Sequence, residues 1–156
     1  MDGSETDQPW RPKLLTEGPW AGWNCYDTDP FENLTGPFYA RRDESGQMVC
    51  AFRAEKKHMN GGGFMHGGCL VTFADYAIFM IAEKELEGGG SVTASLNADF
   101  LDSAREGELI EARGEVVRAG GSMVFLRGLV TTGDRTLLSF TAIIKKIRRR
   151  NAGAAG

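Results

Sequence analysis

The sequence has few of the residues that build metal centres and disulfide frameworks. Its 156 residues include only two histidines and three cysteines. The cysteines, Cys25, Cys50 and Cys69, are scattered and odd in number, whereas a small secreted scaffold carries an even, paired set. No spacing of Cys and His resembles a zinc site. We therefore expect a cytoplasmic protein with reduced cysteines and without a bound metal.

Long hydrophobic runs and an excess of one charge are also missing. The longest apolar stretch, residues 69–82, is shorter than the roughly 20 residues that span a bilayer, and Asp75 interrupts it. A net charge of −3 gives no strong attraction to nucleic acid or to an anionic membrane. The first ten residues are acidic and polar, unlike a signal peptide. We expect neither nucleic acid nor a membrane as a partner.

The chain does have enough length for one domain with a sizeable core. Residues 1–34 hold all three tryptophans and four of the five prolines, and their pattern fits no long element. Because tryptophan side chains seek burial, we expect this N-terminal arm to be irregular or partly helical and to lie on the domain. There it covers the core, or alternatively it forms part of the wall of a ligand pocket. The regular pattern occupies residues 35–150, and we expect residues 151–156 to form a disordered tail.

The regular part predicts one helix and about six strands. Residues 38–42 and 47–54 are typical of a hairpin, and a helix opens at residue 67 and reaches about residue 86. Alternation of apolar and polar side chains predicts strands at 91–101, 108–119, 122–132 and 135–147. Gly120-Gly121 and Gly133-Asp134 supply tight turns, so the last three strands form an antiparallel meander. This order of elements indicates an α+β fold.

The predicted helix is unusually apolar. Among residues 69–82, only Thr72 and Asp75 are polar. A helix that is apolar nearly all round is buried nearly all round. Because the chain has one such helix, either the sheet curls around it or a second subunit helps to cover it. We therefore expect an antiparallel sheet wrapped around one long central helix.

Asp75 is the first candidate for chemistry. Burial of an unpaired carboxylate among apolar side chains costs several kcal/mol, which a chain tolerates when the group has a purpose. One interpretation is a catalytic carboxylate in a site of low polarity. The other is a structural aspartate that accepts a hydrogen bond from a backbone or hydroxyl group and holds the helix. The residue by itself leaves both interpretations open.

The start of the helix is the second candidate. His66-Gly67-Gly68 opens it, and the first N–H groups of a helix are unpaired and electropositive. Because glycine lets a ligand approach the backbone closely, the Gly67 N–H is a candidate oxyanion hole for a carbonyl under attack. The alternative is a glycine turn that serves only the backbone conformation.

The spacing of these two candidates predicts a dimer. Gly67 and Asp75 are eight residues apart, which is about 12 Å along a helix. One carbonyl cannot contact both groups on the same helix. If they act together, Asp75 comes from a neighbouring copy of the helix. A working site then requires a homodimer, alone or within a dimer of dimers, with residues of both subunits in each site.

The motifs resemble the hotdog-fold acyl-CoA thioesterases, and within them the PaaI-like and 4-hydroxybenzoyl-CoA thioesterase branch. The resemblance rests on Asn60, His66-Gly67-Gly68 and Asp75 at the family's spacing, followed by the strand around Thr93. It covers roughly residues 35–147. It implies a hotdog fold, hydrolysis of an acyl-CoA or aroyl-CoA thioester to free acid and CoA, and no cofactor, since the CoA thioester is the substrate.

The resemblance also implies roles for individual residues. The Gly67 N–H, helped by the Asn60 side chain, would bind and polarise the thioester carbonyl. Asp75 of the facing subunit would activate water as a general base or attack as a nucleophile. Thr93 occupies the place of a Ser or Thr that helps to orient the water in relatives. Because Thr93 shares the polar side of its strand in the alternation, a sheet-surface threonine is the alternative.

Substrate binding would involve a loop and a turn. His66 and Gly68 belong to the loop before the helix. The phosphates of CoA need Lys, Arg or backbone N–H groups. The candidates are Arg118 beside Gly120 and Gly121, Arg105, and the basic run at residues 145–150, for which a solvated strand end is the alternative.

Three other functions stay open at this point. Cys69 near the helix start could act as a thiolate nucleophile, although a small buried residue fits the same place. A non-catalytic acyl-CoA-binding protein would share the fold but would not need a buried base. A hotdog dehydratase or hydratase would use a different arrangement of His and Asp or Glu, for which neither His58 nor His66 is convincingly placed.

Overall fold

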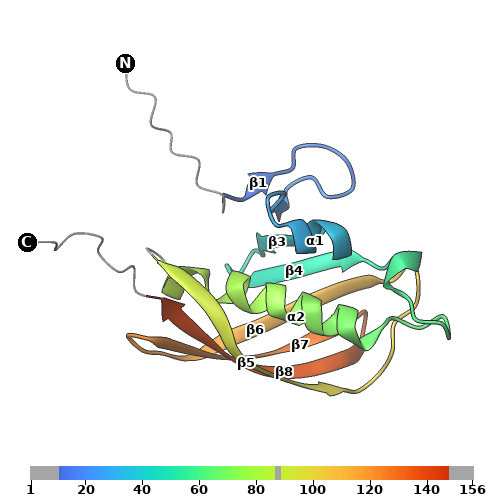
Figure 1. Cartoon of the computed structure of the whole chain (residues 1–156). Coiled ribbons are helices and arrows are strands. Elements are labelled where there is room, and N and C mark those ends of the chain that lie inside the picture. The colour runs from blue at the N-terminus through green and yellow to red at the C-terminus, as the bar shows by residue number, and fades with distance from the viewer. Residues whose placement is uncertain (1–10, 87–88, 148–156) are drawn as a thin grey trace, which may run out of the picture.

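The computed structural model describes residues 11–86 and 89–147 and shows an antiparallel sheet curved around one long helix (Figure 1). The helix, α2, spans Gly67–Ile81 and is followed by a 3-10 turn, η2, at Glu83–Leu86. The strands are β1 (Lys13–Leu14), β2 (Asn24–Cys25), β3 (Tyr39–Arg42), β4 (Met48–Arg53), β5 (Gly90–Phe100), β6 (Leu109–Ala119), β7 (Met123–Thr132) and β8 (Arg135–Ile147). The predicted fold class is confirmed, with eight strands in the described part of the chain instead of about six.

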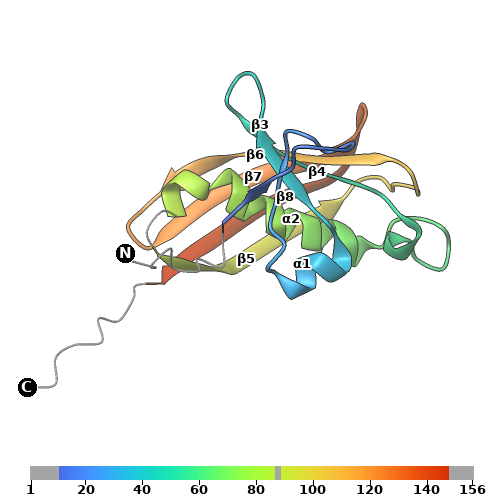
Figure 2. The same ribbon diagram turned by 90° about the horizontal axis from the view of Figure 1, so that it is seen from above.

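The strands lie in the order β1-β2-β3-β4-β6-β7-β8-β5, and every neighbouring pair is antiparallel. Figure 2 shows the same sheet and α2 from above. The β3–β4 hairpin and the β6–β7–β8 meander are therefore as predicted. Gly46 and Gly133 have φ values of 82° and 56°, which suit glycine in the turns after β3 and β7. β5 follows α2 in sequence but pairs with β8, so it forms an edge of the sheet beside the helix.

The two additional strands come from the N-terminal arm. β1 pairs with β2, and β2 pairs with β3, so the arm extends the sheet. Trp23 is buried with Val49 and Ala51, while Trp20 stacks on Tyr39 with ring centroids 4.0 Å apart. These contacts explain why this segment is ordered without a long hydrophobic run. Trp10 and the predicted tail at residues 151–156 lie outside the described residues.

The arm also contributes a short helix, α1 (Pro30–Thr35). Asp29 precedes it, and its Oδ1 accepts hydrogen bonds from the N–H groups of Phe31 at 3.0 Å and Glu32 at 2.9 Å. Proline at the first helical position after such a cap is a usual way to begin a helix. A second 3-10 turn, η1 (Lys56–His58), leads from β4 toward the glycine-rich loop.

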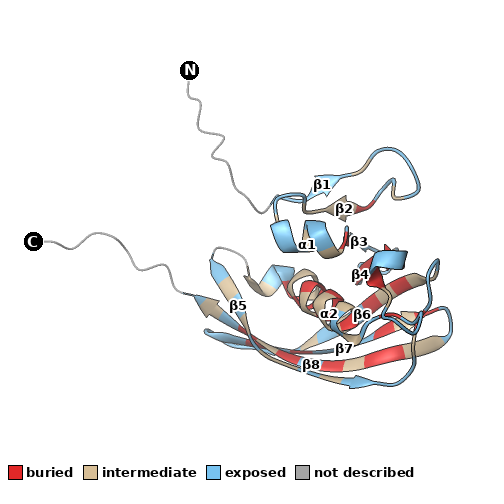
Figure 3. Cartoon of the chain, turned by 45° about the vertical axis from the view of Figure 1, so that its right-hand side comes forward, coloured by how far each residue is buried: buried red, intermediate tan, exposed pale blue. Residues whose placement is uncertain are grey.

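The sheet covers one side of α2 (Figure 3). Phe73, at the centre of the helix, is fully buried and packs on Phe52 with ring centroids 4.7 Å apart. Burial of each such side chain contributes about 1.5–3 kcal/mol. The opposite side of α2, with Thr72, Asp75 and Phe79, is only half-buried. The sheet alone therefore does not enclose the helix. The second subunit that was expected as the other cover stays a prediction.

Among residues 11–86 and 89–147, no helix is long and apolar enough to cross a membrane. The same residues contain no group of three or more His, Cys, Asp or Glu side chains placed to hold a metal ion. Cys25, Cys50 and Cys69 are free thiols.

Candidate active site

His66 starts α2 and shapes the candidate oxyanion hole. Its backbone is extended, with φ −65° and ψ 132°, and its Nδ1 accepts a hydrogen bond from the Gly68 N–H at 2.9 Å. The Gly68 N–H is therefore occupied. Gly67 is the first residue of the helix, and its N–H donates to no acceptor in the part of the chain that the structure describes. Of the two glycines, Gly67 keeps its donor available.

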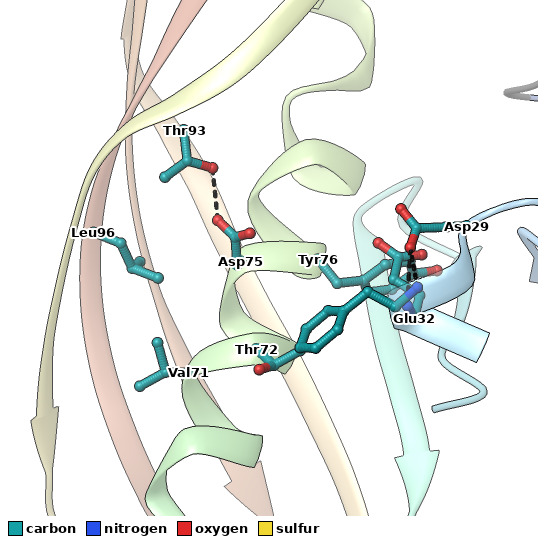
Figure 4. Close-up of a pocket in the computed structure, with 9 residues that line it drawn as sticks. Asp29, Glu32, Val71, Thr72, Asp75, Tyr76, Thr93 and Leu96 are labelled. Atoms are coloured by element: carbon teal, nitrogen blue, oxygen red, sulfur yellow. Dashed lines mark hydrogen bonds between the residues drawn. The ribbon is translucent and has the colours of Figure 1, made fainter. Parts of the chain in front are cut away.

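Asp75 lies in the middle of α2 and faces β5. The Thr93 hydroxyl donates a hydrogen bond of 2.6 Å to its Oδ1 (Figure 4). The described residues offer no hydrogen bond to Oδ2. Asp75 is half-buried, so it is less enclosed than the apolar sequence around it predicted. The carboxylate is thus held by one oxygen and presents the other to its surroundings.

A β-bulge brings Thr93 to this position. Thr93 pairs with Ile144 of β8, and Ser95 pairs with the adjacent Ile143. Ala94 therefore has no partner of its own and is an extra residue in β5. The bulge turns Thr93 to the same side of the sheet as Leu96, which faces α2. The sequence alternation had placed Thr93 on the opposite face from Leu96, and this is wrong because a one-residue insertion reverses the side on which residues point.

The Asp75–Thr93 pair borders a pocket of about 440 Å³. The pocket lies along the open side of α2, between β5 and α1 (Figure 4). β5 contributes Thr93 and Leu96 to one wall, and Asp29, Phe31 and Glu32 of the arm contribute to the other. The sequence left open whether the arm only covers the core or also forms a pocket wall, and it did not single out these three residues. The Asp-Pro pair that begins α1 is a signal for a helix start, but it does not indicate which residues that helix would meet.

Electrostatically, the pocket is acidic. Among the described residues, its lining includes three carboxylates, from Asp29, Glu32 and Asp75, and no Lys, Arg or His. Burial raises the pKa of Glu32 to about 7, and the negative charges of Asp29 and Asp75 add to this effect. Near neutral pH the Glu32 carboxyl group is therefore protonated for part of the time.

Asn60 lies away from this pocket. Its Oδ1 accepts hydrogen bonds from the Gly62 N–H at 2.8 Å and the Phe64 N–H at 3.2 Å, so the side chain holds the glycine-rich loop. It borders a separate hollow together with Lys56 and Glu106. The assistance of Asn60 to the Gly67 N–H stays a prediction.

The suggested CoA-phosphate residues are also separate from the pocket. Arg118, Gly120 and Gly121 are exposed where β6 turns into β7. Strands β7 and β8 lie between β6 and β5, the strand that borders the pocket. The Gly120 N–H donates to the Met123 carbonyl at 2.8 Å, so it is already used. The Arg105 guanidinium lies over a phenylalanine ring at 4.4 Å from its centroid. Of the basic run, residues 148–150 lie outside the described part of the chain.

The alternative catalytic groups have poor surroundings for their roles. Burial raises the pKa of the Cys69 thiol to about 11, which disfavours a thiolate at neutral pH. His58 is buried, and its Nδ1 accepts from the Glu55 N–H at 2.9 Å. Its Nε2 therefore carries the proton and donates to the Thr35 carbonyl at 2.6 Å. Both ring nitrogens of His58 are hydrogen-bonded to backbone groups, and neither is free to transfer protons in a dehydratase reaction.

The Thr93–Asp75 hydrogen bond leads to a test of positioning. We expect Thr93→Val to lower kcat by about 10–100-fold, because a hydrogen bond to a charged group contributes about 1.5–3 kcal/mol and valine keeps the β-branched shape. Thr93→Ser should restore most of kcat, and KM should change little in either variant. Steady-state kinetics of the three proteins checks this. Equal losses in the valine and serine variants would mean that shape matters, not the hydrogen bond.

The chain is similar to known proteins. The family model described as the thioesterase superfamily matches residues 62–139. The chain is 34% identical over 119 residues to the Pseudomonas aeruginosa protein named "Putative esterase PA0474", which covers 76% of this chain and 89% of that protein. It is 26% identical over 95 residues to acyl-coenzyme A thioesterase 13 of Homo sapiens, which covers 61% of this chain and 68% of that protein.

A solved structure shows the same architecture. The TT0310 protein from Thermus thermophilus has a TM-score of 0.66 and 25% sequence identity, over 76% of this chain and 98% of that one. Together with the family match and the sheet wrapped around α2, this similarity settles the classification. The chain belongs to the thioesterase superfamily and is a thioesterase of the hotdog fold.

Proposed function

We propose that this protein hydrolyses an acyl-CoA or aroyl-CoA thioester to the free acid and CoA. The observation that carries the proposal is the Asp75 carboxylate, which has one oxygen held by Thr93 and the other open toward a pocket. The human relative is named an acyl-coenzyme A thioesterase, which supports CoA esters as the substrate class. Thiol release across a panel of CoA esters tests the proposal. Tight binding of these esters without release would instead favour a non-catalytic binding protein.

In the proposed reaction the free oxygen of Asp75 takes a proton from water, and the water oxygen adds to the thioester carbon. The negative charge that develops on the carbonyl oxygen is stabilised by the Gly67 N–H at the positive end of α2. The carbon–sulfur bond then breaks, and CoA leaves as a thiolate that takes up a proton. Alternatively, the same Asp75 oxygen attacks the carbon, and water opens the resulting anhydride.

We infer that each working site combines residues of two subunits. Gly67 begins α2 and Asp75 follows eight residues later, so the two groups are about 12 Å apart along the helix axis. A carbonyl cannot accept from one and be attacked beside the other within the same chain. A second copy of the chain, with its α2 against the half-buried side of this one, supplies the missing group and covers Phe79, which does not line the pocket.

Mixed dimers test this arrangement. Asp75→Asn keeps Gly67, and Gly67→Pro keeps Asp75, so a dimer of one variant with the other has one complete site out of two. If an equal mixture is unfolded and refolded together, half of the dimers are mixed. About a quarter of the sites, and hence of the wild-type activity, should then return under random pairing in a two-fold dimer.

The control for the mixed-dimer experiment is each variant refolded alone, which should stay inactive. Sedimentation before and after refolding shows whether the proteins are dimers. If the refolded mixture has no more activity than its two components, both groups act within one chain, and the composite site is wrong.

A further inference from the structure

The wall of the Asp75 pocket formed by the N-terminal arm contains a carboxylate without a partner. Asp29 uses its Oδ1 to hold the start of α1. Glu32, in the first turn of α1, also lines the pocket, but no hydrogen bond to its carboxylate comes from residues 11–86 or 89–147. Val71 and Leu96 give the rest of the pocket apolar surface. A ligand in this pocket therefore meets an apolar region on one side and a free carboxylate on the other.

Tyr76 adds a second polar group without a partner. Its side chain is 3% exposed, and its hydroxyl is buried with no hydrogen-bond partner among the described residues. Figure 4 shows that it extends from α2 toward the side where Glu32 and Asp29 lie. Tyr76 and Glu32 line the same pocket, and burial raises the pKa of Tyr76. Buried polar groups are normally satisfied, which points to a ligand at this wall.

We propose that Glu32 is a specificity-determining residue, which makes this pocket select acyl groups whose tail carries a hydrogen-bond donor such as a hydroxyl. The proposal rests on the proposed function, because it requires the acyl tail to pass Asp75 toward α1. A pocket with an unpaired acceptor disfavours a tail that leaves it unpaired. The negative charges of Asp29 and Asp75 in the lining also disfavour a tail that ends in a carboxylate.

The selection can be measured without the chemical step. We choose three CoA thioethers of similar length, S-hexyl-CoA, S-(6-hydroxyhexyl)-CoA and S-(5-carboxypentyl)-CoA, which have no carbonyl to hydrolyse. All three share the CoA contacts, so ratios of their dissociation constants report only on the tail. For the full-length wild-type protein we expect the hydroxyl tail to bind about tenfold more tightly than the plain tail. The carboxylate tail should bind more weakly than both.

Two substitutions separate hydrogen bonding from charge. Glu32→Leu removes the carboxylate, so the preference for the hydroxyl tail over the plain tail should fall to about one. Glu32→Gln keeps an acceptor but removes the charge, so it should retain the hydroxyl preference and bind the carboxylate tail more tightly than wild type. Glu44→Leu, at an exposed position in the β3–β4 turn, is the matched control and should keep the wild-type ratios.

A purely structural role of Glu32 would weaken all three ligands together and leave their ratios unchanged. Unchanged ratios in the Glu32 variants would overturn the inference. Equal binding of the three tails by the wild type would overturn it as well, and so would no measurable binding of any tail. Failure of the proposed function has a different signature. In that case no CoA ester releases thiol, while the thioethers still show the preference for the hydroxyl tail and its loss in Glu32→Leu.

Discussion

Replacement of Asp75 by asparagine should leave the fold intact and lower kcat by about 10²–10⁴-fold, the range for loss of a positioned general base. Asparagine has nearly the same shape as aspartate, and its carbonyl oxygen can still accept the hydrogen bond from the Thr93 hydroxyl. The packing of α2 is therefore kept. The amide cannot take a proton from water and cannot attack a carbonyl, so both versions of the reaction lose their reactive group.

The measurement is thiol release from a CoA ester that the wild type cleaves, together with thermal unfolding of both proteins. Asp134→Asn makes the same chemical change at an exposed turn between β7 and β8 and should keep full activity. Activity of Asp75→Asn close to that of the wild type would contradict a catalytic role and return Asp75 to the structural interpretation.

Gly67→Pro should lower kcat by about 10²–10³-fold, the usual effect of removing one oxyanion-hole donor. Proline has no N–H, so it deletes the donor directly. The backbone suits proline at this position, because it is the first residue of α2, where the N–H has no helical partner. The preceding residue, His66, has φ −65° and ψ 132°, in the extended region that a residue before proline requires.

Gly67→Ala is the matched control for this substitution. An added Cβ at Gly67 lies 3.1 Å from a ring carbon of Phe100, so alanine and proline meet the same steric contact. Alanine keeps the N–H, and we expect it to lose far less activity than proline. Kinetics of the two variants with one CoA ester gives the comparison. Similar losses in both would assign the effect to the Phe100 contact and remove the N–H from the reaction.

The order and type of the main elements could be predicted from the sequence, because local patterns determine them. Two-residue alternation locates β5 to β8 within a residue or two, since each strand has one face toward the core. The apolar run around Asp75 marks α2, and the run His66-Gly67-Gly68 marks its start, whereas the cap formed by the His66 side chain is seen only in the structure. The spacing of Gly67 and Asp75 also follows from the sequence, because the rise of a helix is constant.

The neighbours of Asp75 were decided only by the tertiary structure. The bulge at Ala94 depends on how β5 pairs with β8, and this pairing, not the alternation in β5, turns Thr93 toward the carboxylate. Glu32 reaches the same pocket because β2 joins the sheet beside β3 and brings α1 over α2. These contacts join segments that are distant in the chain. The sequence alone therefore determined which carboxylate to test, whereas the packing of the sheet and the arm decided what surrounds it.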